Sequence, residues 1–226
     1  MKFNWAEFLN FSDMLLPLWE TVYMVIISMF FALLIGLPIG ILLVTSEESH
    51  IAPNKTLNKI LDIILINITR SIPFIILMVI LIPAARGIVG KSFGTEAFIV
   101  YLSLGSAPFV ARVIEGSLNE VDRGLIEASK SLGASNFHII MKVLLPEALP
   151  SLIHGIILTL ITLIGYSAMA GIVGGGGLGN AAVVAGFQNS NPEIIWKATI
   201  IIIILVQIIQ FFGNVIVSKI YKKRGK

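Results

Sequence analysis

The sequence predicts an all-α integral membrane protein with five transmembrane helices, an N-terminus outside the cell and a cytoplasmic C-terminus. Of its 226 residues, 56% are hydrophobic and 13% are charged, and the mean hydropathy is +0.93. A soluble domain of this size does not reach such values. The apolar residues form runs long enough to cross a bilayer, and the basic residues gather on one side of these runs. We therefore expect a single transmembrane domain, residues 1–226, in the lipid bilayer.

Residues 1–17 have the composition of an interfacial helix rather than of a membrane span. Aromatic and apolar side chains are interspersed there with the charged residues Lys2, Glu7 and Asp13. Such a segment suits the boundary between lipid headgroups and acyl chains. A disordered tail is the alternative interpretation.

Four runs are long enough for membrane-spanning helices, which need about 20 predominantly apolar residues. Segments 21–46 and 198–218 are uncharged, and segment 63–85 carries only Arg70. A fourth span is expected over 150–173, ahead of a cluster of glycines. After these glycines the sequence favours a short helix.

A fifth segment, 97–111, is shorter and contains Gly105 and Pro108. Its length leaves open a core helix, a re-entrant segment or a full span. If it is a full span, segment 116–147 and the C-terminus share one side with most of the basic residues: Lys55, Lys59, Arg112, Arg123, Lys130, Lys142, Lys219, Lys222, Lys223, Arg224 and Lys226. The opposite side holds Lys2, Arg86, Lys91 and Lys197. Because basic residues favour the cytoplasmic side, we expect five spans.

The cytoplasmic coupling segment, 116–147, is predicted to form two short helices with a corner between them. Residues 117–120, Ser-Leu-Asn-Glu, have the form of a capping box. Apolar residues then recur at helical spacing: Val121, Leu125, Ala128 and Leu132. Gly133 can take the left-handed conformation that a sharp turn needs, and Ser135 can cap a second helix, which Pro146 interrupts.

Ile126 points away from this apolar stripe on the predicted first helix. Its neighbours on that side are Arg123, Glu127 and Lys130. An isoleucine is unexpected at a solvent-facing position unless another surface covers it. The two interpretations are a docking surface and an ordinary amphipathic helix with one stray isoleucine.

The order Glu127-Ala128-Ser129, then Gly133, then Val143-Leu144-Leu145-Pro146 resembles a known signature. It is similar to the cytoplasmic loop of membrane-spanning permease subunits of bacterial ABC importers. The resemblance implies that ATP-binding subunits dock on this segment. The residues it implies for docking are Arg123, Ile126, Glu127, Ala128, Ser129, Lys130 and Gly133.

Three further stretches, 67–77, 165–171 and 174–179, resemble the permeases of methionine importers in particular. The resemblance implies a homodimer in the bacterial cell membrane, two ATP-binding cassette subunits and an external methionine-binding protein. It implies no cofactor and no enzyme activity in this chain, because the partner subunit hydrolyses ATP. The alternatives are a permease for another small amino acid or betaine, and an ion-coupled secondary transporter. The latter would show inverted repeats and broken helices, which the sequence does not indicate.

Arg70 and Pro73 are predicted to have a structural role inside the membrane. An arginine in hydrocarbon costs about 3 kcal/mol. Pro73 cannot donate a hydrogen bond to the Thr69 carbonyl, so Arg70 is expected to satisfy freed carbonyls or an acidic group on another helix. Direct contact with the substrate is the alternative.

Met169, Tyr166 and Ser167 are the candidate residues of a gate or translocation path. Met169 lies among small residues that let helices approach closely: Gly165, Ser167, Ala168, Ala170 and Gly171. It either closes a pore or fills a packing gap. The glycine run that follows lacks the Lys-Ser/Thr ending of a phosphate-binding loop. The three histidines are scattered, so we expect no metal site, and we expect no nucleic-acid partner.

Overall fold

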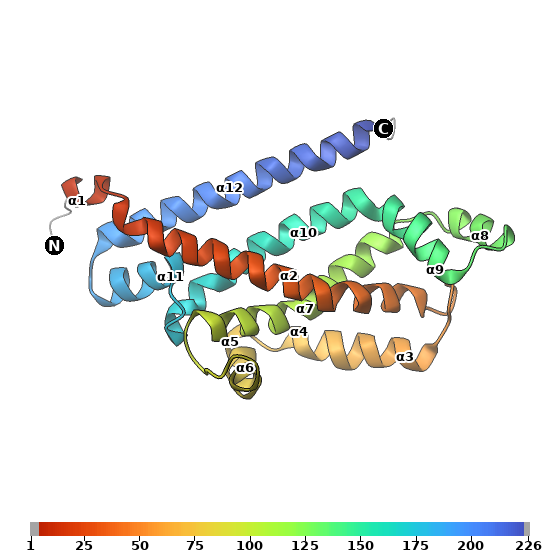
Figure 1. The fold of residues 1–226 in the computed structure, drawn as a ribbon, viewed down its shortest axis with the longest axis horizontal. Helices are drawn as coiled ribbons and strands as arrows, with labels where there is room; N and C mark the ends of the chain where they lie inside the picture. Colours follow the sequence, from red (N-terminus) through yellow and green to blue (C-terminus); the bar gives the residue numbers. More distant parts are fainter. Residues whose placement is uncertain (1–4, 224–226) are drawn as a thin grey trace. The chain divides into compact units, whose positions relative to one another are not determined.

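The structure is a computed structural model that describes residues 5–223, and every regular element in that range is helical (Figure 1). The contacts divide the chain into two units. The first unit comprises Met1–Phe31, Pro73–Gly105 and Leu160–Phe211. The second unit comprises Ala32–Ile72, Ser106–Thr159 and Phe212–Lys226. The cytoplasmic coupling segment therefore belongs to the second unit.

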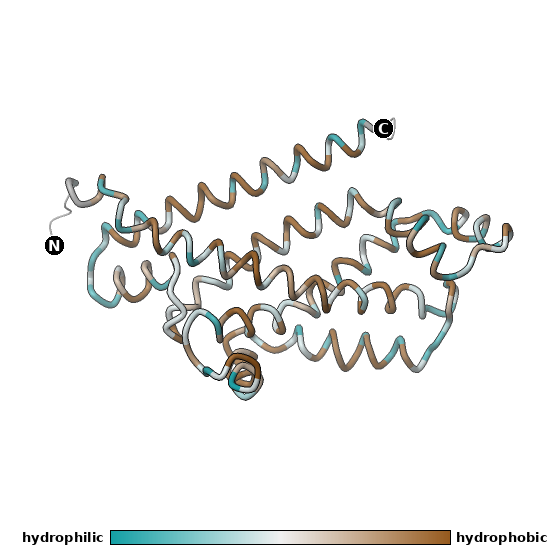
Figure 2. Tube along the Cα trace, viewed as in Figure 1, coloured by the Kyte–Doolittle hydropathy of each residue, from teal (hydrophilic) through white to brown (hydrophobic). Residues whose placement is uncertain are grey.

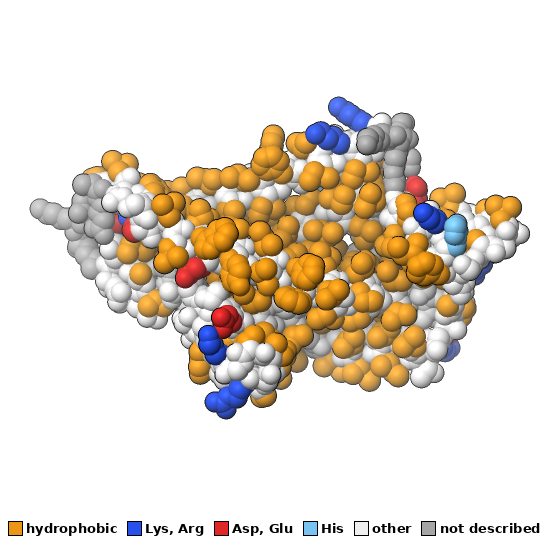
Figure 3. All heavy atoms as spheres, viewed as in Figure 1, with side chains coloured by type: hydrophobic (Ala, Val, Ile, Leu, Met, Phe, Trp, Pro, Cys, Tyr) orange, Lys and Arg blue, Asp and Glu red, His pale blue; other side chains and the backbone are white. Residues whose placement is uncertain are grey.

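Within the described residues, four helices are long and apolar enough to cross a membrane. A fifth span is obtained if one bent helix pair, Lys55–Ser71 with Phe74–Ile80, is counted as a single span. Hydrophobic residues predominate along the long helices (Figure 2), and hydrophobic side chains dominate the surface in view (Figure 3). The helices of the four uninterrupted spans are α2 (Leu15–Thr45), α7 (Thr95–Asn119), α10 (Leu145–Ser167, continued by the 3-10 helix η4, Ala168–Val173) and α12 (Pro192–Lys223).

The segment predicted as one helix over 63–85 is a broken helix. It starts earlier, because the Asn54 side chain caps it by accepting a 3.0 Å hydrogen bond from the Leu57 N–H. It breaks at Ile72, whose ψ of 125° is extended, because Pro73 disfavours helical backbone before it. The pieces are α3 (Lys55–Lys59), the π-helix η2 (Ile60–Ile68), α4 (Thr69–Ser71), α5 (Phe74–Ile80) and α6 (Ile82–Val89).

The short segment 97–111 is resolved as part of α7, a full-length helix that contains Pro108. In the second unit α7 packs closely against α2. A Cβ atom added at Gly40 of α2 would lie 2.7 Å from the Ala111 carbonyl oxygen. This position therefore requires glycine for close helix packing.

The glycine-rich turn of the first unit leads into the predicted short helix, which is confirmed as α11 (Gly177–Asn180) and the π-helix η5 (Ala181–Gln188). Gly177 has a φ of +80°, and its N–H donates to the Glu20 carboxylate at 2.6 Å. The next N–H, of Leu178, donates to the Thr21 hydroxyl at 2.8 Å. The start of α2 thus holds the turn.

The described residues of the predicted interfacial segment 1–17 are helical except for Asn10 and Phe11. Its pieces are α1 (Trp5–Leu9) and the 3-10 helix η1 (Ser12–Met14), while residues 1–4 lie outside the described range. The Asp13 carboxylate accepts a 2.8 Å hydrogen bond from Lys197, whose side chain is buried. This ion pair joins the N-terminal segment to α12 within the first unit.

Replacing Gly40 by alanine should destabilise the protein, because the added methyl group meets a backbone oxygen that cannot move aside. Overpacking of this kind costs about 1–3 kcal/mol. The loss of stability is measured as a fall in the melting temperature of the purified protein in detergent. The matched control is Gly116→Ala in α7, where an added Cβ meets nothing within 4 Å. Equal melting temperatures for the two variants would contradict the close packing of α2 on α7.

Candidate docking surface and intramembrane residues

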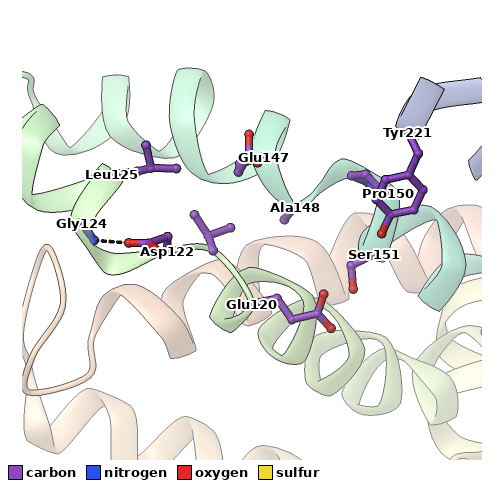
Figure 4. A pocket seen from close by; sticks show the side chains of 10 residues that line it. Glu120, Asp122, Gly124, Leu125, Glu147, Ala148, Pro150, Ser151 and Tyr221 are labelled. Carbon is purple, nitrogen blue, oxygen red and sulfur yellow. Dashed lines mark hydrogen bonds between the residues drawn. The ribbon is translucent and has the colours of Figure 1, made fainter. Parts of the chain in front are cut away.

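Helix α8 (Arg123–Ser131) is the first helix of the coupling segment, and it starts later than predicted. Asp122 is its N-cap and accepts a 2.6 Å hydrogen bond from the Gly124 N–H (Figure 4). Ser117 lies inside α7 instead, where its hydroxyl donates to the Val113 carbonyl at 3.0 Å. The predicted capping box is therefore wrong, because α7 extends to Asn119 and the Asp122 carboxylate caps the next helix instead.

The predicted faces of α8 are also wrong. Ile126 is 6% exposed and belongs to an apolar cluster with Leu118 and Leu144. Leu125 and Leu132, expected on the buried stripe, are 45% and 88% exposed. Tertiary packing decides which face of α8 is buried, and it selects the side that carries Ile126 rather than the stripe with Leu125 and Leu132. Ile126 therefore anchors α8 to its own chain, and its predicted solvent-facing position is wrong, while its part in docking stays a prediction.

The predicted corner after α8 is confirmed. Gly133 has a φ of +82°, and its N–H donates to the Lys130 carbonyl at 2.9 Å. Ser135 then caps α9 (Asn136–Ile139) by accepting from the His138 N–H at 3.3 Å. A residue with a side chain is strained at the backbone conformation of Gly133.

Pro146 does not interrupt the second helix, contrary to the prediction. The chain stays helical over Asn136–Val173. A π-helical stretch, η3 (Ile140–Leu144), precedes Pro146, which is the second residue of α10. The helix therefore accommodates the missing N–H of Pro146 directly after a π-helical stretch, an irregularity at which helices commonly bend.

The outer face of α8 carries the remaining predicted docking residues. Glu127 and Ala128 are exposed, and half-buried Ser129 donates to the Leu125 carbonyl at 2.7 Å. At the corner beyond them, Leu132 and Phe137 are 88% and 74% exposed. Large exposed apolar side chains of this kind are typical of contact surfaces.

Arg123 and Lys130 donate hydrogen bonds to the loop that follows α2 and contains Ser49 and His50. Arg123 donates to the Ser49 hydroxyl at 3.1 Å, and Lys130 donates to the His50 carbonyl at 3.1 Å. The imidazole of His50 is buried, and its Nδ1 has no hydrogen-bond partner among the described residues. Burial lowers the pKa of His50; Glu47 opposes this shift, and Lys130 and Arg123 add to it.

A cavity of about 530 Å³ lies beside the start of α8 in the second unit (Figure 4). Three of its lining side chains are acidic: Glu120, Asp122 and Glu147. Tyr221, near the end of α12, lines it from another side. Carboxylates repel phosphate groups, so the lining does not suit a nucleotide.

An unpredicted charge cluster lies between η2 and α7. Arg112, predicted from sequence to lie on the cytoplasmic side, is inside α7 and pairs with Asp62 and, at 2.7 Å, with Glu115. Its guanidinium also donates to the Asn67 amide oxygen at 2.9 Å. The spacing of Arg112 and Glu115, three residues apart, was the available signal for a helical pair.

Arg70 does not make the contacts predicted for it. The Thr69 carbonyl that Pro73 cannot reach accepts from the Ile72 N–H at 3.3 Å instead. The Arg70 guanidinium lies over the Phe109 ring, with Cζ 5.8 Å from the ring centroid. No acidic side chain among the described residues pairs with Arg70. Pro73 does break the helix, as its sequence position indicates.

The candidate gate residues lie at the end of α10 in the first unit. Met169 is half-buried in η4. The Tyr166 ring stacks on Phe74 with centroids 4.7 Å apart. Ser167 is buried and donates to the Ile164 carbonyl at 2.7 Å, so within this chain it stabilises the helix end and does not line an open surface.

Comparison with protein families matches residues 36–224 to the family of binding-protein-dependent transport system inner membrane components. A probable D-methionine transport system permease protein MetI of Vibrio cholerae is 47% identical over 92% of this chain and 93% of that protein. The methionine import system permease protein MetP of Bacillus subtilis is 46% identical over 80% of this chain and 82% of that protein.

Solved structures share the fold. A chain of the MetNI methionine ABC transporter in an inward-facing conformation has a TM-score of 0.88 and 46% identity, over 92% of this chain and 98% of that chain. An amino acid ABC transporter crystallised with histidines has a TM-score of 0.78 at 18% identity, over 97% of this chain and all of that chain. The second likeness concerns the fold alone.

Acidification should loosen the loop around His50. Because the folded-state pKa is lowered, His50 contributes stability above its ordinary pKa of about 6.5, and this is lost as the pH falls towards the folded-state value. Protection of the amides of residues 46–51, expressed relative to the intrinsic exchange rate at each pH, should be lower at pH 5.5 than at pH 7.5, about one pH unit below and above that value. His50→Gln should remove the difference, and the exposed control His138→Gln should keep it. The same pH response in His50→Gln would contradict this account.

Proposed function

Because the chain belongs to the family of binding-protein-dependent transport system inner membrane components, we propose that it is the permease subunit of an ATP-driven methionine importer. The observation that carries this proposal is the likeness, over nearly the whole chain, to permeases that are named for methionine. It is a multi-pass protein of the bacterial inner membrane.

ATP-binding subunits are proposed to dock on the outer face of α8 and on the corner after it. The exposed Leu132 and Phe137 supply apolar contact area, and Glu127 supplies a charge beside them. The basic residues of the second unit favour the cytoplasmic side for this surface, where ATP is available. Ile126 transmits force from the surface to the spans.

ATP hydrolysis is assigned to the partner subunit. The glycine-rich turn, which is the part of this chain closest in composition to a phosphate-binding loop, holds the Glu20 carboxylate on the N–H of Gly177. A carboxylate at that position repels phosphate. The turn thus braces the outer end of the spans, and a separate subunit provides nucleotide chemistry.

The permease is proposed to act as a homodimer that receives methionine from an external binding protein. Two copies of the half-buried Met169 would close the path between them, with apolar contacts that exclude water. The small neighbours Ala168, Ala170 and Gly171 leave room for the methionine to move. Alternation between inward-open and outward-open states then follows ATP binding and hydrolysis as a population shift.

Uptake into proteoliposomes tests the function. The purified chain, reconstituted with an ATP-binding subunit and the external binding protein, should import radiolabelled methionine only when ATP is present on the side of the ATP-binding subunit. Uptake driven by an ion gradient without ATP would identify a secondary transporter instead. Uptake of betaine in preference to methionine would contradict the assignment of methionine as the substrate.

Leu132→Glu and Gly133→Val should each weaken docking of the ATP-binding subunit. The first places a charge in an apolar contact, and the second forbids the left-handed turn, which costs about 1–2 kcal/mol. Co-purification with a tagged ATP-binding subunit and stimulation of its ATPase should both fall. Gly87→Val, at an open helical position of α6, should leave both unchanged. Normal stimulation in Gly133→Val would contradict the docking surface.

Met169→Ala should open a leak across the membrane. Shortening the side chain removes the apolar contact at the gate, while Met sites tolerate substitution in packing. ATP-independent methionine flux in proteoliposomes should rise above that of the wild type. If instead the variant does not leak and loses about 2–5 kcal/mol of stability, as a cavity in a packed core would cause, Met169 is a packing residue.

A further inference from the structure

Arg70 lies near the end of the helical arm Lys55–Ser71, which together with Phe74–Ile80 makes up one candidate membrane span. At a rise of about 1.5 Å per residue, it is up to about 22 Å along the arm from Lys55. The hydrocarbon core of a bilayer is about 30 Å thick. With Lys55 on the cytoplasmic side, the Arg70 guanidinium is well inside the membrane, next to the break at Ile72.

The side chain of Arg70 is exposed on this chain, and so are those of Asn67 and Ser71, which share its helix face. A charged side chain and an amide are costly in contact with hydrocarbon. This face therefore meets water or another polar group in the assembled protein. It is not a lipid-facing surface.

The guanidinium of Arg70 is held in place without being neutralised. Phe109 lies 5.8 Å from its Cζ, and a guanidinium over an aromatic ring keeps its N–H donors at its edge. Among the described residues, none accepts a hydrogen bond from Arg70. The donors are thus oriented and unpaired.

Arg112 provides the contrast within the same unit. It has two carboxylate partners, Asp62 and Glu115, and the amide oxygen of Asn67. This is how the chain stabilises an arginine that has a structural role in the membrane. Arg70 lacks every one of these contacts.

Asn67 adds a donor to the same face. Its Oδ1 accepts from Arg112, so its Nδ2 is directed elsewhere as a hydrogen-bond donor. Arg70 and Asn67 together present N–H groups and no acceptor of their own. The planar fork of a guanidinium matches a carboxylate in a bidentate pair.

We propose that Arg70, assisted by the Asn67 amide, binds the carboxylate of the transported amino acid as it crosses the membrane. This inference rests on the proposed import function and adds a site to it. The ligand class is amino acids with a free carboxylate. Compounds that lack this group, such as the amine left by decarboxylation of methionine, are not bound there.

The test uses the complex with its ATP-binding subunit and compares Arg70→Gln with Lys59→Gln. Both variants remove one positive charge from the same helical arm, and Lys59 is exposed near its cytoplasmic end. Arg70→Gln should assemble and hydrolyse ATP, yet import methionine at a rate lower by about tenfold or more, as expected when a charge-assisted pair is removed. Lys59→Gln should import normally.

A binding measurement separates the site from transport. Methionine should raise the melting temperature of the wild-type complex more than 3-(methylthio)propylamine does, and Arg70→Gln should abolish the difference. Equal responses of the wild type to the two compounds, or normal uptake by Arg70→Gln, overturn the carboxylate site. Loss of assembly in Arg70→Gln also overturns it, because Arg70 would then hold the second copy. A wild-type complex that imports no methionine but keeps the difference overturns the proposed function alone.

Discussion

The position of helix α8 in the cytoplasmic part of the molecule depends on the packing of the Ile126 side chain. This side chain packs in one apolar cluster with residues of α7 and of the helix that becomes α10. Burying such a side chain contributes about 1.5–3 kcal/mol, whereas an exposed ion pair contributes about 0–1 kcal/mol. Helix α8 is therefore fixed to the spans by its apolar face. Its outer face remains available for a partner, so force applied there reaches the membrane helices.

The two arginines of the second unit that lie in membrane helices show how one residue type serves two purposes. Arg112 is paired with Asp62 and Glu115, which makes it part of the helix packing. Arg70 is supported by an aromatic ring and has no acceptor among the described residues. The broken helix places Arg70 beside backbone that is not helical, since Ile72 is extended. Backbone that is not helical is tolerated at membrane depth only where it is buried in protein or lines a water-filled cavity.

Sequence reasoning predicted the features that depend on local chemistry. The uncharged spans, the left-handed turn at Gly133 and the cap at Ser135 follow from composition and backbone preference. The errors concern features that tertiary contacts decide. The start of α8 was mispredicted because Asp122 is its N-cap, and the buried face of α8 was mispredicted because Ile126, rather than Leu132, packs into the apolar cluster. Periodicity alone does not reveal where a helix begins, and it does not reveal which acid reaches which arginine.

The coupling ratio of Ile126→Ala tests most directly whether α8 is a lever fixed to the spans. The variant keeps the exposed docking face but loses about 2–5 kcal/mol of anchoring. Methionine imported per ATP hydrolysed, measured in proteoliposomes, should fall below that of the wild type and of the exposed neighbour Leu125→Ala, while the ATP-binding subunit still co-purifies. An unchanged ratio in Ile126→Ala would contradict the account.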